Sequence, residues 1–247
     1  MFHSIFRVFQ TNILATNKQI LFRQCSNGQQ NVAILTKTTE KPKSDIHKVR
    51  ISGRVMNVFK NGRNVTFYIK SVVGNFTKTH KAVISTRNQS LFTSAEEYLA
   101  KNQYVCIEGK LNSEQIKTDD GKIRNLLTIV VADLVMSESN EHCKNDLNEI
   151  ELMGRVTTDV IKNPNHRAFN LSVVKKPATA ESGPEYIYNR VFVYDTEWFP
   201  IVDEIKKRMK NILIRGELDY SGFKLPSGKN GVSGIIIANQ IYQMKQS

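Results

Sequence analysis

The sequence has few of the residues that mark metal centres, disulfide frameworks and nucleophilic active sites. Its three cysteines, Cys25, Cys106 and Cys143, show no CxxC spacing, and its five histidines are scattered. A zinc site, a disulfide framework and a catalytic relay are therefore not indicated. We expect no catalytic residue, no metal and no cofactor, so the protein is predicted not to be an enzyme. Free thiols fit a reducing compartment.

Long apolar runs are also missing. No stretch approaches the ~20 residues that a membrane-spanning helix needs, so no membrane partner is expected. The segment GFKLPSGKNG, residues 222–231, is no phosphate loop. The interval before its Gly-Lys pair is wrong, and a predicted strand follows where a phosphate loop needs the N-terminus of a helix. A hairpin turn explains this segment better.

Acidic residues are absent from the first 39 positions, where basic, hydroxyl and amide side chains are common. On a helix, the apolar residues of this stretch gather on one face, which is typical of a mitochondrial transit peptide. A surface helix of the mature fold is the alternative. The segment Arg23–Ser26 resembles a presequence cleavage site. We expect a transit peptide over residues 1–26, a flexible lead-in over 27–45, and a location in the mitochondrial matrix, at the nucleoid.

Basic residues outnumber acidic ones in the chain as a whole. Lys and Arg number 35 against 23 Asp and Glu, which gives a formal net charge of +12. Such an excess favours a polyanionic partner or an anionic membrane surface. With 247 residues, 40% of them hydrophobic, the chain has the length and composition for one large or two small globular domains.

The two halves of the chain share a pattern that recurs after roughly 100 residues, which indicates a duplicated domain. The first copy opens HKVRISGRV and the second NEIELMGRV, with Gly53 and Gly154 in equivalent places. A glycine within a strand marks a bulge or bend, which small barrels need. We expect a domain over residues 46–136, a linker over 137–147 and a second domain over 148–245.

Within each copy, three predicted strands precede a short helix, and a fourth strand, a hairpin turn and a fifth strand follow it. The helix is expected over 90–102 in the first copy and over 197–211 in the second. This is the element order of the OB-fold, a small barrel that binds oligonucleotides. The predicted fold class is all-β with short helices, as two tandem five-stranded OB-fold barrels.

The most unusual stretch is EYIYNRVFVY, from Glu185 to Tyr194. Alternation along a strand places aliphatic residues on one face. The other face receives four aromatic residues and an arginine, namely Tyr186, Tyr188, Arg190, Phe192 and Tyr194. Such a face needs either a second layer of protein or a flat ligand that stacks, and unpaired bases are such a ligand. The strand alone leaves both interpretations open.

The motifs GRV, YIYNRVFV and ILIRGEL and the closing hairpin resemble, in their order, the single-stranded-DNA-binding proteins of bacteria and mitochondria. The resemblance covers both copies and is stronger in the second. It implies sequence-tolerant binding of single-stranded DNA, in replication or repair of mitochondrial DNA, with Tyr188, Tyr194 and Phe223 stacking on bases. An RNA-binding factor of the same organelle and an OB-fold scaffold for other proteins are the alternatives.

Basic residues are expected to follow the phosphates of a bound strand. In the first copy Thr79 and Ser85 stand where the second has Tyr188 and Tyr194, so the stacking set is lost while cations are kept. That copy is interpreted as a weaker electrostatic module or as an assembly module. The candidate cations are Arg167, Lys175, Lys176, Arg190 and Lys224 in the second copy and Lys60, Arg63, Lys81, Lys117 and Lys122 in the first.

The resemblance also bears on assembly. Members of the family with one OB domain per chain form tetramers, and a subclass with two domains per chain forms dimers. We therefore expect a homodimer, with replication proteins as further partners, and a closed symmetric dimer is also the commonest soluble assembly. A monomer whose two barrels bind one strand in tandem is the alternative.

Overall fold

The computed structural model describes residues 46–118, 121, 123–137, 146–176, 179, 182–224 and 230–243. The predicted transit peptide, the lead-in and most of the predicted linker lie outside these residues. The described part is mostly β-structure with two short α-helices, as expected for the fold class. Neither helix is long and apolar enough to cross a membrane.

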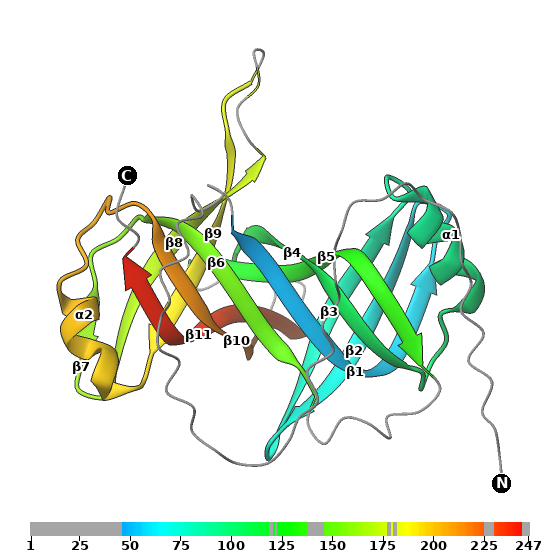
Figure 1. The fold of residues 1–247 in the computed structure, drawn as a ribbon, viewed down its shortest axis with the longest axis horizontal. Coiled ribbons are helices and arrows are strands. Elements are labelled where there is room, and N and C mark those ends of the chain that lie inside the picture. The colour runs from blue at the N-terminus through cyan, green and yellow to red at the C-terminus, as the bar shows by residue number, and fades with distance from the viewer. Residues whose placement is uncertain are drawn as a thin grey trace, which may run out of the picture. The chain divides into compact units, whose positions relative to one another are not determined.

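The first five strands close into a barrel of the OB type, which we call the first ring (Figure 1). Their order is β2-β3-β5-β4-β1, and pairing of β2 with β1 closes the circle. The α-helix α1 (Gln89–Tyr98) lies between the third and fourth strands in sequence, as predicted. The strands are β1 (His47–Lys60), β2 (Asn64–Val73), β3 (Phe76–Ser85), β4 (Tyr104–Lys117) and β5 (Ile123–Ser137).

The remaining strands continue the same sheet, in the order β6-β10-β11-β9-β8-β7, and β6 also pairs with β8. We call β6, β8, β9, β10 and β11 the second ring. The 3₁₀-helix η1 (Thr196–Trp198) and the α-helix α2 (Phe199–Asp203) lie between β9 and β10. The strands are β6 (Asn148–Val156), β7 (Ile161–Asn163), β8 (His166–Lys176), β9 (Glu185–Val193), β10 (Ile212–Lys224) and β11 (Asn230–Gln243).

The helix of the second ring is shorter than predicted. It ends at Asp203, although helical spacing of apolar residues continues to Met209. The backbone explains the difference, because Val156 accepts a hydrogen bond from Arg208 N–H at 2.8 Å and donates one to the Met209 carbonyl at 2.9 Å. Arg208 has a left-handed φ of 73°. Because these peptide groups are hydrogen-bonded to Val156 at the end of β6, they cannot form the next turn of the helix.

The first ring contains the same arrangement at the equivalent position. Val55 accepts from Asn102 N–H at 2.7 Å and donates to the Gln103 carbonyl at 2.9 Å, and Asn102 has a φ of 69°. The two rings thus share this detail at matching places.

Gly53 and Gly154 permit a close approach of two backbones in their rings. A Cβ atom on Gly154 would lie 2.3 Å from the Ser172 carbonyl oxygen, and one on Gly53 would lie 2.3 Å from the Lys70 carbonyl oxygen. Before each glycine the strand pairs with one set of neighbours, and beyond it with another strand of its own ring. Each glycine of the two Gly-Arg-Val motifs therefore stands where its strand changes partners, which is the place predicted for a bend.

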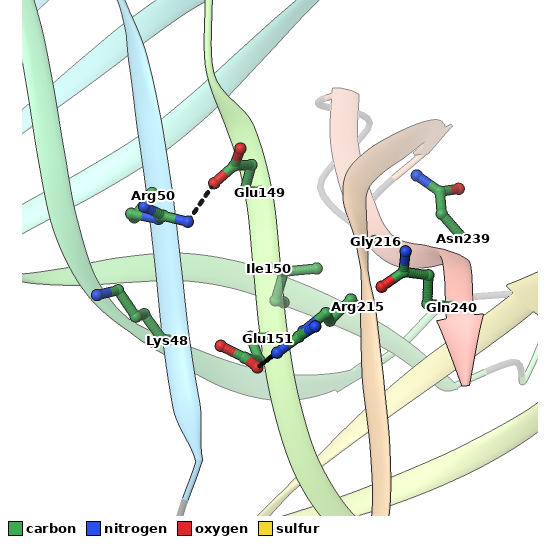
Figure 2. Close-up of a pocket in the computed structure, with 9 residues that line it drawn as sticks. All are labelled: Lys48, Arg50, Glu149, Ile150, Glu151, Arg215, Gly216, Asn239 and Gln240. Carbon is green, nitrogen blue, oxygen red and sulfur yellow. Dashed lines mark hydrogen bonds and ion pairs between the residues drawn. The ribbon is translucent and has the colours of Figure 1, made fainter. Parts of the chain in front are cut away.

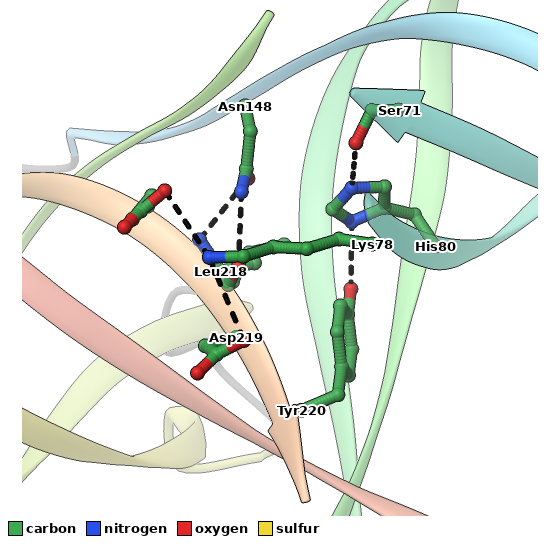
Figure 3. A network of polar contacts seen from close by, with 8 residues as sticks. Ser71, Lys78, His80, Asn148, Leu218, Asp219 and Tyr220 are labelled. Atoms are coloured by element: carbon green, nitrogen blue, oxygen red, sulfur yellow. Dashed lines mark hydrogen bonds and ion pairs between the residues drawn. The ribbon is translucent and has the colours of Figure 1, made fainter. Parts of the chain in front are cut away.

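Contacts from several described elements join the rings. Strands β1 and β6 pair antiparallel, with Val49 opposite Ile150. The Lys78 ammonium lies 3.2 Å from a Glu217 carboxylate oxygen. The buried His80 ring contacts Ser71 Oγ through Nε2 at 2.7 Å and Tyr220 Oη through Nδ1 at 2.9 Å (Figure 3).

Replacing Gly154 with alanine is expected to destabilise the protein by roughly 1–3 kcal/mol, because the new methyl group overlaps the backbone of β8. Gly183→Ala is the matched control, since a Cβ there has no neighbour within 4 Å. Chemical denaturation of both variants checks the prediction. Equal stability of the two variants would contradict it.

The protein is expected to lose stability as the pH is lowered, because of His80. Burial, with help from the Lys78 charge, lowers its pKa from 6.5 to about 4, so the folded protein keeps the ring neutral while the unfolded chain protonates it. The free energy of unfolding should drop as pH falls from about 6.5 to about 4, with roughly 2 kcal/mol of the loss from this residue between pH 7 and 5.

His47, whose pKa burial also lowers to about 4, contributes in the same pH window. Denaturation of wild type and His80→Gln at pH 7 and pH 5 separates the two contributions. The variant should lose about half as much stability as wild type over this interval. An unchanged pH dependence would refute the assignment to His80.

Candidate nucleic-acid interface

The outward face of β9 carries the aromatic residues that the sequence singled out. Ile187, Val191 and Val193 are buried in the core, as alternation predicted. The described residues leave the other face of β9, which carries the aromatic residues, uncovered. Exposed fractions there are 46% for Tyr186, 42% for Tyr188 and 48% for Tyr194, which directly follows the strand. A buried sandwich core is therefore wrong for these three rings.

Phe192 and Tyr194 form the ordered end of this face. Their rings lie nearly parallel, at 10°, with centroids 6.1 Å apart. The His166 ring of β8 contacts both, at centroid distances of 5.4 Å and 5.7 Å. Aromatic neighbours restrict the rotation of these rings, so part of the entropy of ordering is already lost before any ligand stacks.

Arg190 lies among the aromatic side chains of β9, as the sequence predicted. Its guanidinium donates to Asn170 Oδ1 at 3.1 Å and lies 5.5 Å from the centre of the Phe192 ring. Partial burial lowers the pKa of Arg190 from its ordinary value, but an arginine stays protonated at any pH of interest. A fixed positive charge therefore accompanies the aromatic face.

The first ring holds the backbone of this strand in place. Asn125 Nδ2 of β5 donates to the Tyr188 carbonyl at 3.0 Å, and Ser113 Oγ of β4 donates to the same oxygen at 3.3 Å. The β4–β5 hairpin thus lies against the strand that carries the rings. The exposed face belongs to an anchored element.

The structure gives the predicted cation Arg167 protein partners. Its guanidinium donates to both carboxylate oxygens of Asp203, at 2.7 Å and 3.2 Å, and lies 4.1 Å from the centre of the Phe199 ring. Its side chain is 15% exposed, and the hydrogen bond from Arg167 is the main cause that lowers the pKa of Asp203. These contacts tie β8 to α2. A phosphate contact by Arg167 stays a prediction.

The other predicted cations of the second copy have different surroundings. Lys175 and Lys176 are exposed at the end of β8 and pair with Glu185, at 3.7 Å and 2.7 Å. The hydrogen bond from Lys176 is the main cause that lowers the pKa of Glu185. Exposed pairs of this kind contribute little to stability, so both ammonium groups can exchange partners. The side chains of Phe223 and Lys224 lie outside the described part of the structure.

The predicted cations of the first copy do not form one cluster. Lys60 donates to the Glu96 carbonyl of α1, so its ammonium is held against the helix. Lys81 lies on β3 opposite Tyr68, and Arg63 lies in the turn before β2. Lys117 is exposed at the end of β4, and Lys122 lies outside the described residues.

Sequence reasoning missed aromatic residues on the first ring. Phe59 of β1 is 57% exposed, and its ring meets that of Tyr68 edge-on, with centroids 6.1 Å apart. Tyr68 lies opposite Lys81. Alternation along VTFYIKSV could have placed Tyr68 outward, but the expected aromatic positions were those of the strand equivalent to β9. The first ring therefore retains aromatic surface, one strand away from the expected place.

A mixed-charge face covers the outer side of β1, β6 and β10 (Figure 2). Arg50 pairs with Glu149 at 2.6 Å, and Arg215 pairs with Glu151 at 2.8 Å. Cations and anions alternate across the strands, so the local charge nearly cancels. This face offers little attraction to a polyanion.

Metal chemistry has no visible place in the described part of the chain. No group of three or more His, Cys, Asp or Glu side chains gathers there at a spacing that could hold a metal ion. The groups that converge are aromatic rings and fixed cations. Rings stack on flat ligands, and cations attract phosphates, so this arrangement suits binding of a nucleic acid strand.

Neither a protein-family model nor a curated protein matches the sequence. Among solved structures, the wild-type single-stranded DNA binding protein from Thermus aquaticus is similar over 82% of this chain and 94% of that chain, with 14% identity and a TM-score of 0.58. A deletion mutant of that protein gives a TM-score of 0.55, over 82% of this chain and 96% of that chain, at 14% identity.

Rim1, a mitochondrial single-stranded DNA binding protein from S. cerevisiae, matches 39% of this chain and 99% of that chain, at 22% identity and a TM-score of 0.34. At these identities the likeness is one of fold, and the two Thermus aquaticus structures, with TM-scores above 0.5, carry it. The described chain therefore has the OB-type fold of a single-stranded DNA binding protein, as the resemblance in sequence predicted.

Proposed function

We propose that this protein binds single-stranded DNA with little sequence preference. The observation that carries the proposal is the row of half-exposed tyrosines beside Arg190 along β9, whose Tyr188 carbonyl is bound by Asn125 of the first ring. Stacking on an aromatic ring is worth about 1–3 kcal/mol per base and tolerates any base. Lysines and arginines release counterions from phosphates and make the affinity depend on salt.

The two rings are proposed to be tandem OB-fold domains over residues 46–136 and 148–245, joined by a linker over 137–147. Both have closed strand pairings in the OB order and share the contact of Val55 or Val156 with the segment before the fourth strand. Single-stranded DNA binding is stated for the Thermus aquaticus protein, whose similarity extends over 82% of this chain.

The cellular setting is proposed from the sequence. A transit peptide over residues 1–26 would direct the chain to the mitochondrial matrix, where the protein would protect single strands at the nucleoid during replication or repair of DNA. The bases are bound by Tyr188, Tyr194 and Phe223 in this proposal, with Arg190 beside them. The proposed phosphate contacts are Arg167, Lys175, Lys176, Lys224, Lys60, Arg63, Lys81, Lys117 and Lys122.

Alanine at Tyr188 or Tyr194 is expected to weaken binding to single strands by about 1–3 kcal/mol per ring, which is roughly 5- to 150-fold in Kd. Tyr188→Ala keeps the carbonyl that accepts from Asn125, so the substitution removes the ring alone. Fluorescence titration of oligonucleotides of several sequences measures the loss. Tyr98→Ala is the matched control, because Tyr98 is an exposed tyrosine on α1 and should bind no base.

Several outcomes would overturn parts of this proposal. Equal affinity for duplex and single strands, or an affinity independent of salt, would reject single-strand binding. Unchanged affinity in Tyr188→Ala, with loss of a protein complex, would favour a scaffold. Tighter binding to single-stranded RNA than to DNA of the same sequence would assign the protein to RNA, because no residue here is identified as reading a 2′-hydroxyl.

A homodimer is the proposed assembly, and the mixed-charge face is the surface best suited to it. Alternating cations and anions allow a second copy to place opposite charges against each other around a two-fold axis. Light scattering is expected to give the mass of two chains. Arg50→Glu should shift the mass toward one chain, because it leaves three carboxylates, with Glu149 and Glu151, where charges alternated. A mass of one chain for wild type, with and without a long oligonucleotide, would contradict the dimer.

A further inference from the structure

A basic groove runs from the first ring to the end of β8. Its volume is about 920 Å³. The ends of β2 and β3, the residues before α1, the middle of β4 and part of β5 line it. No acidic residue is among the described residues that line this groove. Five basic residues are, namely Arg63, Arg87, Lys110, Lys175 and Lys176.

The charge of this groove differs from that of the mixed-charge face. There each arginine has a carboxylate within 3 Å. Here Lys175 and Lys176 share Glu185, while no described carboxylate forms an ion pair with Arg63, Arg87 or Lys110. Gathering cations without counter-charges costs repulsion, which a polyanion in the groove would relieve.

His47 stays neutral near pH 7 and adds no charge to the groove. Its ring is buried at the groove wall, where Nε2 accepts a hydrogen bond from Leu111 N–H at 2.9 Å. Burial first, and the nearby Lys110 charge second, lower the pKa of His47 to about 4. The positive charge of the groove therefore comes from its lysines and arginines.

The groove lies beside the strand that carries the aromatic face. Asn112 of β4 lines the groove, and the next residue, Ser113, donates to the Tyr188 carbonyl. On the other side, Lys176 lies opposite Glu185, and Val174 lies opposite Tyr186 at the start of the aromatic face. A DNA strand that passes from Tyr186 toward the end of β8 would meet Lys175 and Lys176 within one or two residues of that β-strand.

We propose that this groove holds the sugar-phosphate backbone of the single strand whose bases stack on β9, with Arg87 and Lys110 as phosphate contacts. The inference rests on the proposed function and extends it, since it gives the bound backbone one path along the groove and adds Arg87 and Lys110 to the phosphate contacts. Neither residue was singled out from the sequence, because the expected sites followed the strands equivalent to the aromatic one.

The test is the salt dependence of affinity for a long single-stranded DNA in the double variant Arg87→Gln/Lys110→Gln. Each lost phosphate contact lowers the slope of log K against log salt by about 0.7, so the double variant should lose about 1.4 and bind roughly 25-fold more weakly at 0.1 M salt. Both side chains are exposed, and denaturation of the variant confirms that the fold is unchanged.

Lys101→Gln/Lys207→Gln is the matched control, because it removes two exposed charges from the turns after α1 and α2, outside the groove. Its slope should equal that of wild type. An oligonucleotide short enough to cover only the tyrosines should bind the groove variant and wild type alike.

The outcomes separate the two proposals. If wild type fails to bind single strands at low salt, the proposed function is wrong. If wild type binds but Arg87→Gln/Lys110→Gln keeps the wild-type slope, the groove proposal alone is overturned. The same result would follow if the groove accommodates an acidic protein segment instead of nucleic acid.

Discussion

Strand β1 pairs with three neighbours, and the rest of the structure depends on that arrangement. Its first half lies between β4 and β6, while its second half turns to β2. The turn is possible because Gly53 lets the Lys70 carbonyl come closer than a side chain would allow. Gly154 gives β6 the same freedom. Each ring therefore closes on itself and still offers half a strand to the other, so neither leaves this edge unpaired.

The pairing of β1 with β6 also determines which elements lie next to the aromatic strand β9. Because β1 and β6 fix the rings against each other, the β4–β5 hairpin of the first ring meets β9, and β10 of the second meets β3 through Tyr220 and His80. The contacts at β9 use the Tyr188 carbonyl rather than its ring. Packing is thus satisfied through the backbone, and the side chains stay available to a ligand. Exposed rings cost little when the strand beneath them is already anchored.

Much of the fold was predictable from the sequence, because it rests on local rules. Alternation identified the core and outer faces of β9, and the repeated Gly-Arg-Val identified the bends. The end of α2 was not predictable, since the apolar spacing continues to Met209 and only the tertiary hydrogen bonds with Val156 stop the helix. The ion pair of Arg167 with Asp203 was also hidden, because the two residues are 36 positions apart and meet only in the fold.

Net charge illustrates the same limit for function. The excess of 12 positive charges indicates a polyanionic partner but says nothing about where the charges act. Folding neutralises some of them, as at Arg50 and Arg215 on the mixed-charge face, and leaves others without carboxylates, as at Arg87 and Lys110. Both places have lysines and arginines, and only the carboxylates that neighbouring strands bring beside them distinguish the two. In the groove, Arg87 and Lys110 form no ion pair with a described carboxylate. The groove is therefore the part of the surface where the excess positive charge can attract a nucleic acid.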